Sequence, residues 1–151
     1  MSDNGKKDSH DFFLKEIDII QSIIKRMSHN SFLIKGWTIT LVVVSLLLKG
    51  TQEHIFLAII PLVTFWLLDS YFLRQERLYR KLYEWVIENR LKNDQELFSM
   101  KTDRFTDDVS KFKTTFSRTL LWFYGTIAVL VGLYACIVSD KVITLFNNLN
   151  S

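Results

Sequence analysis

The sequence contains few of the residues that mark redox sites, sharp turns and catalytic loops. It has one cysteine, one proline, five glycines and three histidines among 151 residues. The single Cys136 excludes an intrachain disulfide, and its place in an apolar run is typical of a small packed side chain rather than a metal ligand. The sequence offers no glycine-rich phosphate loop, no serine elbow and no paired metal ligands at helical spacing. We therefore expect no enzymatic activity, no cofactor and no metal.

Apolar residues concentrate in three runs, Phe32–Leu48, Ile55–Leu68 and Leu120–Val138. A helix that crosses a bilayer needs about 20 mostly apolar residues, with roughly 17 as the lower end. The third run meets this length, and the second meets it if Asp69–Leu73 lies at the interface. The first run is short and carries Lys35 near its start. The runs predict three transmembrane helices.

The first two runs have an alternative interpretation as a buried hairpin of a soluble protein. Against it, Leu41–Leu48 and Ile55–Leu68 show no polar face at helical period, as lipid contact requires. The first apolar run begins only at residue 32, after a charged segment, so we expect no secretory signal peptide in these residues.

Basic residues predict the orientation of the spans. Seventeen of the 19 Lys and Arg residues fall in residues 1–35 and 74–118, and only Lys49 and Lys141 fall elsewhere. Loops rich in Lys and Arg stay in the cytoplasm. We therefore expect a multi-pass protein of a bacterial inner membrane, with the N-terminus and residues 74–118 inside and the 49–54 turn outside.

The net charge of +3 and the pI near 9.0 indicate attraction to the bilayer and to its anionic lipids. Nucleic acid is a less favoured partner, because acidic residues are interleaved with the basic ones throughout.

The predicted fold is all-α, a transmembrane hairpin plus a third span. We expect a cytoplasmic N-terminal segment with an amphipathic helix over 1–30, the hairpin over 31–73 and a cytoplasmic helical hairpin over 74–118. The third span covers 119–139, and an external tail covers 140–151.

Within the N-terminal segment, residues 1–8 are predicted to be disordered and Ser9 to cap a helix over 10–28. One apolar stripe at heptad spacing follows this helix: Phe13, Ile17, Ile20, Ile24 and Met27. The stripe predicts a helix packed on the cytoplasmic face or against a neighbouring subunit. Ser28–Ser31 is expected to break the helix, with Asn30 or Ser31 capping the first span.

The Lys49–Glu53 segment is long enough only for a tight turn, so the first two spans form an antiparallel hairpin. With Leu48 opposite Ile55, Lys35 lies level with Asp69 at the cytoplasmic edge. A charge within the membrane is costly and usually finds a partner. We expect a Lys35–Asp69 ion pair; the alternative is that each side chain extends separately to the head groups.

Pro61 lies in the middle of the second span and frees the carbonyl of Leu57. We expect a kink there, either a tolerated one, which we favour, or a hinge. No Gly or Pro interrupts residues 62–100, which predicts that the second span continues as one long helix into the cytoplasm. Aromatic and basic residues expected to anchor the chain at the lipid interface are Trp37, Tyr71, Arg74, Arg77, Arg80, Lys81, Arg118 and Trp122.

A turn is predicted near 92–103, followed by a helix that starts at Thr102 or Asp103. Its apolar positions are Phe105, Val109, Phe112 and Phe116, and its pattern continues into the third span. The cytoplasmic part is thus expected to be an antiparallel helical hairpin.

The third span carries a face of small residues at steps of three and four: Gly125, Ala128, Gly132, Ala135 and Ser139. In lipid, small residues allow helix backbones to approach closely. The face predicts helix packing, either with a span of the same chain or with another copy. Hydroxyls in the spans either line a narrow pore or, as we favour, bond their own helix backbones: Thr38, Thr40, Ser45, Thr64 and Thr126.

Two stretches, NSFLIKGW (30–37) and FWLLDSYFLRQERLYRKLY (65–83), carry a resemblance that covers roughly residues 25–90. The chain resembles a family of small, largely uncharacterised bacterial inner-membrane proteins. The matching residues are Asn30, Lys35, Gly36, Trp37, Trp66, Asp69, Tyr71, Arg74, Glu76, Arg77, Arg80 and Tyr83. The layout of the spans is also similar to oligomeric membrane effectors of bacterial defence, an analogy of layout and not of matched residues.

These observations favour a homo-oligomeric membrane effector or channel-like protein in stress or phage defence. The alternative is a non-conducting membrane scaffold that docks a cytoplasmic protein partner.

Overall fold

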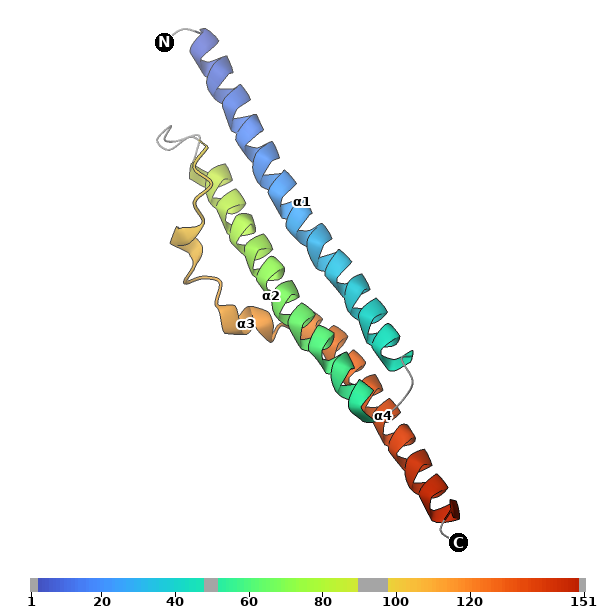
Figure 1. The fold of residues 1–151 in the computed structure, drawn as a ribbon. Helices are drawn as coiled ribbons and strands as arrows, with labels where there is room; N and C mark the ends of the chain where they lie inside the picture. The colour runs from blue at the N-terminus through green and yellow to red at the C-terminus, as the bar shows by residue number, and fades with distance from the viewer. Residues whose placement is uncertain (1–2, 48–51, 90–97, 150–151) are drawn as a thin grey trace. The chain divides into compact units, whose positions relative to one another are not determined.

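A computed structural model describes residues 3–47, 52–89 and 98–149, with side chains described over 10–47, 57–89 and 98–138. Within these ranges the regular elements are all helical (Figure 1). They are α1 (Asp3–Leu47), α2 (Gln52–Asn89), the 3-10 turn η2 (Asp103–Phe105), α3 (Lys111–Thr115) and α4 (Arg118–Leu149). The predicted turn at 49–53 and part of the turn near 92–103 lie largely outside the described residues.

Helix α1 corrects three predictions for the N-terminal segment. It begins at Asp3, so residues 3–8 are helical rather than disordered and Ser9 does not cap it. It also continues through 28–31 without a break. The reason is tertiary packing: Ser31, Ile34 and Thr38 are buried in line with Ile20, so the buried seam runs on through the expected break. Packing along a whole helix face outweighs the weak helix propensity of Ser and Asn.

Helix α2 runs from the apolar run into the charged segment as one helix, as predicted, and it passes through Pro61 without ending. Helix α4 continues to Leu149, so most of the predicted tail is helical.

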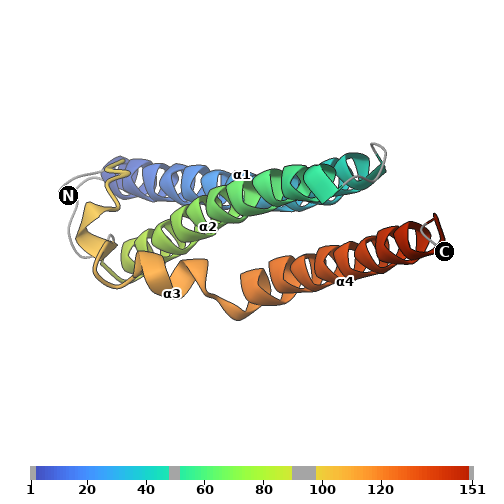
Figure 2. The same ribbon diagram turned by 60° about the horizontal axis from the view of Figure 1, so that its bottom comes forward.

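The predicted return helix from Asp103 into the third span is wrong. The chain instead forms η2, a stretch of turns, the five-residue α3 and a break at Phe116–Ser117 before α4 (Figure 2). Residues 102–117 are rich in Thr, Ser and Asp, whose side chains compete for local backbone hydrogen bonds and weaken a helix. As a result, Val109 is buried, whereas Phe112 and Phe116 are exposed.

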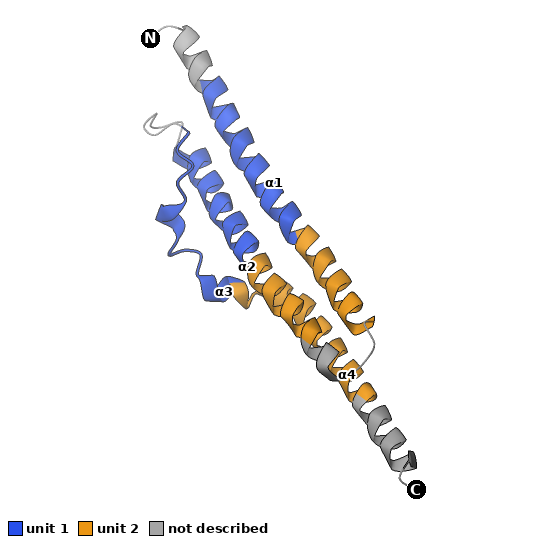
Figure 3. Cartoon of the chain, in the orientation of Figure 1, with its two compact units in different colours: residues 1–31, 71–114 blue, residues 32–70, 115–151 orange. Residues whose placement is uncertain are grey.

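The chain divides into two compact units, each built from segments distant in sequence (Figure 3). Unit 1 comprises residues 1–31 and 71–114, and unit 2 comprises residues 32–70 and 115–151. The division falls close to the predicted limits between polar and membrane segments.

Unit 1 has its own apolar core. Ile20 of α1 packs with Leu82 and Val86 of α2, and all three are fully buried. Around them lie partly buried apolar residues. Three come from the predicted stripe of α1, namely Phe13, Ile17 and Ile24. The others are Tyr79, Tyr83, Trp85, Met100 and Phe105. Four of the five stripe residues thus pack on α2 of the same chain, which corrects the prediction that the stripe packs on the cytoplasmic face or against a neighbouring subunit; Met27 is not part of this cluster. The Arg104 guanidinium lies 4.3 Å from the centre of the Trp85 ring and holds the segment around η2 against this core.

Unit 2 contains the apolar parts of α1, α2 and α4. Three described helices are long and apolar enough to cross a membrane, one in each of these elements. Only 22%, 22% and 11% of their most apolar stretches are buried within the chain. Such large exposed apolar surfaces are rare on soluble monomers, so they weigh against a soluble hairpin.

Candidate functional site

An ion pair in unit 2 joins charged residues of its first two apolar segments. Lys35 Nζ of α1 lies 2.6 Å from Asp69 Oδ2 of α2. The Asp69 side chain is fully buried and that of Lys35 is 21% exposed. The structure thus places the two predicted partners together, at the register deduced from the hairpin. A buried pair of this kind is costly to break, because one charge would then lack compensation.

Tyr124 brings the third helix to this ion pair. Its hydroxyl lies 3.2 Å from Asp69 Oδ2 and 3.1 Å from the carbonyl oxygen of Phe65, so its single proton is shared between two acceptors. The Lys35 ammonium also lies 5.9 Å from the centre of the Phe123 ring. We call Lys35, Asp69 and Tyr124 the polar clamp, because they connect α1, α2 and α4.

The sequence prediction missed Tyr124. The available signal was a tyrosine hydroxyl inside an apolar run, which needs a partner in lipid. The position of Tyr124 in the sequence does not indicate which helix supplies that partner.

A second cluster connects α2 to the chain just before α4. Trp66 Nε1 donates to the carbonyl oxygen of Thr115 at 3.1 Å, and the hydroxyls of Ser70 and Thr115 lie 2.6 Å apart. The Trp66 ring meets Phe116 edge to face at 5.5 Å. These contacts fix the start of α4 beside α2 within unit 2.

Other hydroxyls in the spans bond their own helices. Thr38, Thr40, Ser45 and Thr126 each donate to the carbonyl four residues earlier, at 2.6–3.0 Å. Local bonding is the arrangement that the sequence favoured over pore lining. Tyr134 instead reaches the carbonyl of Leu46 at 3.4 Å, a weak bond that links α4 to α1.

The small-residue face of α4 borders an apolar groove of about 500 Å³. Gly125, Ala128, Gly132 and Ala135 form one wall, and residues of α2, including Leu62 and Trp66, form the other. A Cβ atom added at Gly125 or Gly132 would meet nothing within 4 Å. Among the described residues, these glycines therefore do not bring a second backbone close to α4. Ser139 belongs to α4, but its side chain lies outside the described residues.

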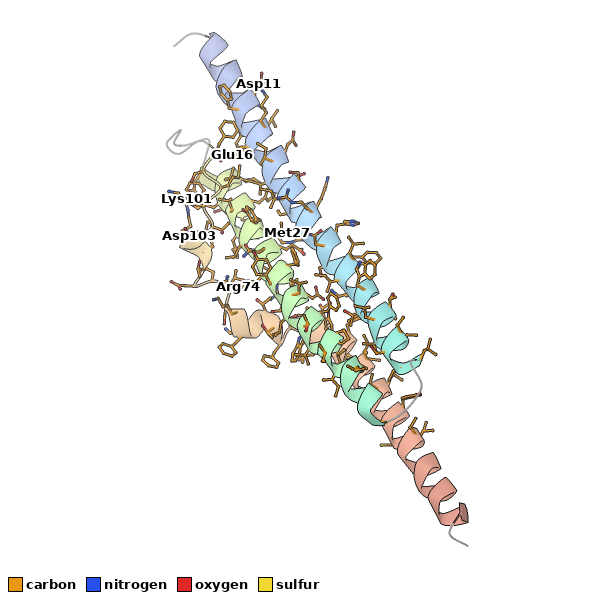
Figure 4. All side chains as sticks on the ribbon, viewed as in Figure 1. Asp11, Glu16, Met27, Arg74, Lys101 and Asp103 are labelled. Atoms are coloured by element: carbon orange, nitrogen blue, oxygen red, sulfur yellow. The ribbon has the colours of Figure 1, made fainter. Side chains whose placement is uncertain are left out.

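The predicted interface residues are mostly exposed, as lipid contact requires. Trp37, Tyr71 and Trp122 are 58%, 54% and 76% exposed, and Arg118 begins α4. Figure 4 labels Arg74 on α2. Arg74 has a structural role as well, because its Nε donates to the carbonyl of Val109 at 3.1 Å. Arg77, Arg80 and Lys81 follow on α2 in unit 1.

The described residues hold no group of three or more His, Cys, Asp and Glu side chains placed to bind a metal ion. The chemistry that the polar clamp supports is electrostatic: a neutralised ion pair with a shared hydroxyl that sets the register of three helices.

Comparisons of the chain with protein-family models, curated proteins and solved structures give no match. The resemblance to a family of bacterial inner-membrane proteins therefore stays a prediction, carried by the residues quoted above.

Proposed function

We propose that the chain is a homo-oligomeric protein of a bacterial inner membrane, acting as a membrane effector or channel-like protein. In this proposal α1, α2 and α4 each cross the bilayer once. The N-terminus and residues 74–118 face the cytoplasm, in accord with the distribution of Lys and Arg. A setting in stress or phage defence rests on the analogy of layout alone.

The glycine-lined groove is the observation that best supports the proposal that several copies assemble. Three helices cannot enclose a pore, so any effect on membrane permeability needs several copies. In lipid, close packing of backbones on small residues is a main source of helix association. Within the part of the chain that the structure describes, the Gly125–Gly132 face lacks such packing, and a second copy would supply it.

Leucine substitutions on this face test assembly. Gly125→Leu with Gly132→Leu should reduce the oligomer to a smaller species, measured as mass in detergent, because the larger side chains block the approaching helix. Gly36→Leu is the matched control, since a Cβ atom at Gly36 also meets nothing within 4 Å but lies away from the groove. An oligomer that survives the double substitution rules out this face as the contact.

A non-conducting scaffold is the second candidate. It is favoured by the span hydroxyls, which bond their own helices and leave little polar surface for a pore. Exposed apolar side chains on unit 1, such as Phe12, Ile19 and Ile87, would then dock a cytoplasmic protein. Membrane potential during expression separates the candidates: depolarisation favours the effector, and an unchanged potential with a stable oligomer favours the scaffold.

A further inference from the structure

A basic hollow of about 310 Å³ lies within unit 1, between α2 and the segment that leads into α3. Its cationic side chains are Arg77, Arg80 and Lys81 of α2 and Lys113 of α3. Its two acidic side chains are Glu84 and Asp108. Cations from two separate segments therefore converge on one concave surface, which a solvated helix face does not require.

The charges of the hollow are only partly compensated. Arg80 bonds Glu76 at 2.7 Å, and Lys81 bonds Glu84 at 2.8 Å. Within the part of the chain that the structure describes, Arg77 and Lys113 make no hydrogen bond or ion pair. A hydrogen bond from Lys81 to Glu84, together with the charge of that carboxylate, raises the pKa of Lys81 above its ordinary value. With four cationic and two acidic side chains in its lining, the hollow carries a net positive charge.

Side-chain bonds to backbone carbonyls hold the wall of the hollow that carries Lys113. Arg74 Nε donates to the carbonyl of Val109, and Thr114 Oγ1 donates to the carbonyl of Ser110 at 3.0 Å. Val109 and Thr114 are buried. The wall that carries Lys113 is thus fixed against α2 rather than free in solution.

An exposed aromatic residue adjoins this wall. Phe112 is 79% exposed, the highest value among the large apolar residues described, and Lys111 and Lys113 flank it. An exposed aromatic ring between two lysines fits the boundary between acyl chains and head groups. It favours a lipid over a soluble anion as the occupant of the hollow.

We propose that the hollow binds the phosphate group of an anionic phospholipid of the inner leaflet, with Arg77 and Lys113 as its principal ligands. The guanidinium of Arg77 presents two donors to a phosphate oxygen pair, and Lys113 adds a point charge from the opposite wall. The proposal rests on the inner-side placement of residues 74–118 within the proposed function, but not on assembly or conduction.

Native mass spectrometry of the full chain in detergent tests the site, with phosphatidylglycerol and phosphatidylcholine as probes. Arg77→Gln with Lys113→Gln should weaken phosphatidylglycerol binding by about tenfold or more, since both principal phosphate ligands are removed while Arg80 and Lys81 remain. Lys15→Gln with Arg26→Gln is the control, because it removes the same charge from exposed positions on α1 of unit 1. Equal affinity in the two double variants would overturn the proposal.

Asp108→Asn provides a second test, in which the expected result is a gain in phosphatidylglycerol affinity rather than a loss. Removal of an acidic side chain from the hollow should strengthen phosphatidylglycerol binding severalfold, and an unchanged affinity would count against the site.

Inorganic phosphate distinguishes the source of the ligand. Displacement of the lipid by millimolar phosphate would overturn the assignment to a lipid, whereas retention of the lipid supports it. Because bound lipid is counted per chain, this result is independent of the oligomer mass that tests assembly.

Discussion

At the scale of single residues, the fully buried Asp69 depends strongly on its surroundings. It receives the Lys35 ammonium at 2.6 Å and the Tyr124 hydroxyl at 3.2 Å. In a medium of low dielectric constant, a carboxylate without such partners carries a large desolvation cost. The stability of unit 2 should therefore respond to these residues more than to any exposed charge.

Lys35→Met should destabilise the protein by about 3 kcal/mol or more, because it leaves Asp69 buried without a counter-charge. Lys35→Met combined with Asp69→Asn should cost less than Lys35→Met alone. Thermal unfolding in detergent, followed by tryptophan fluorescence, measures both. Reversal of both charges together should likewise preserve expression better than either reversal alone. Equal damage from single and double changes would show that the two residues act separately.

Tyr124→Phe should cost about 1–2 kcal/mol, since it removes only the hydroxyl that Asp69 and the Phe65 carbonyl share. Tyr134→Phe is the matched control: its hydroxyl has one long contact of 3.4 Å, so its loss should change the unfolding midpoint less. A larger effect of Tyr134→Phe would contradict the importance given to the polar clamp.

The ion pair could be deduced from sequence because a short turn fixes the register of a hairpin and few charges are available inside it. The contact of Tyr124 with Asp69 could not be deduced in this way. Tyr124 lies on a third helix, 55 residues from Asp69 in the sequence, and the geometry of the hairpin does not determine the rotation of that helix. Contacts fixed by local geometry were thus predictable, and contacts fixed by the docking of α4 were not.

At the scale of elements, α1 is a single helix whose buried seam continues from unit 1 into unit 2. Ser31 is 8% exposed and occupies the next heptad step after Met27, so its role is packing rather than capping. The sequence signal for continuity was the spacing from Met27 to Ser31, Ile34 and Thr38. The prediction of a break gave more weight to the preference of Ser and Asn for helix N-caps, whereas in the structure the packing of this face prevails. The irregular segment 102–117 reflects the opposite case, in which local polar residues prevail over an apolar period.

Asn30→Pro tests whether α1 is continuous. In a helix interior, proline removes a hydrogen bond and clashes with the preceding turn, at a cost of about 3 kcal/mol or more. Asn30→Ala is the control and should be neutral or slightly stabilising. Far-ultraviolet circular dichroism and the unfolding midpoint report the change. Tolerance of proline would instead indicate that a new helix starts near this position, where proline is accepted.

At the scale of the whole molecule, the chain has one unit rich in charged residues and one apolar unit; parts of α1 and α2 belong to both, whereas α4 belongs to unit 2. Charge and hydropathy predicted the separation of polar from apolar segments, because both properties are averages over many residues, but they did not predict that segments distant in sequence form two compact units. The groove and the basic hollow were not predictable, since each depends on how side chains of two segments meet. The sequence identified the small-residue face of α4, but it did not show that this face borders a groove rather than a closely packed helix.

Cysteine labelling tests most directly the proposal that three helices cross the membrane with the N-terminus inside. Single cysteines are introduced in a Cys136→Ser background as Ser9→Cys, Thr51→Cys, Thr106→Cys and Ser151→Cys, and intact cells are treated with a membrane-impermeant maleimide. The account predicts labelling at 51 and 151 in intact cells, and at 9 and 106 only after permeabilisation. Labelling at 106 in intact cells, or protection at 151, would contradict it.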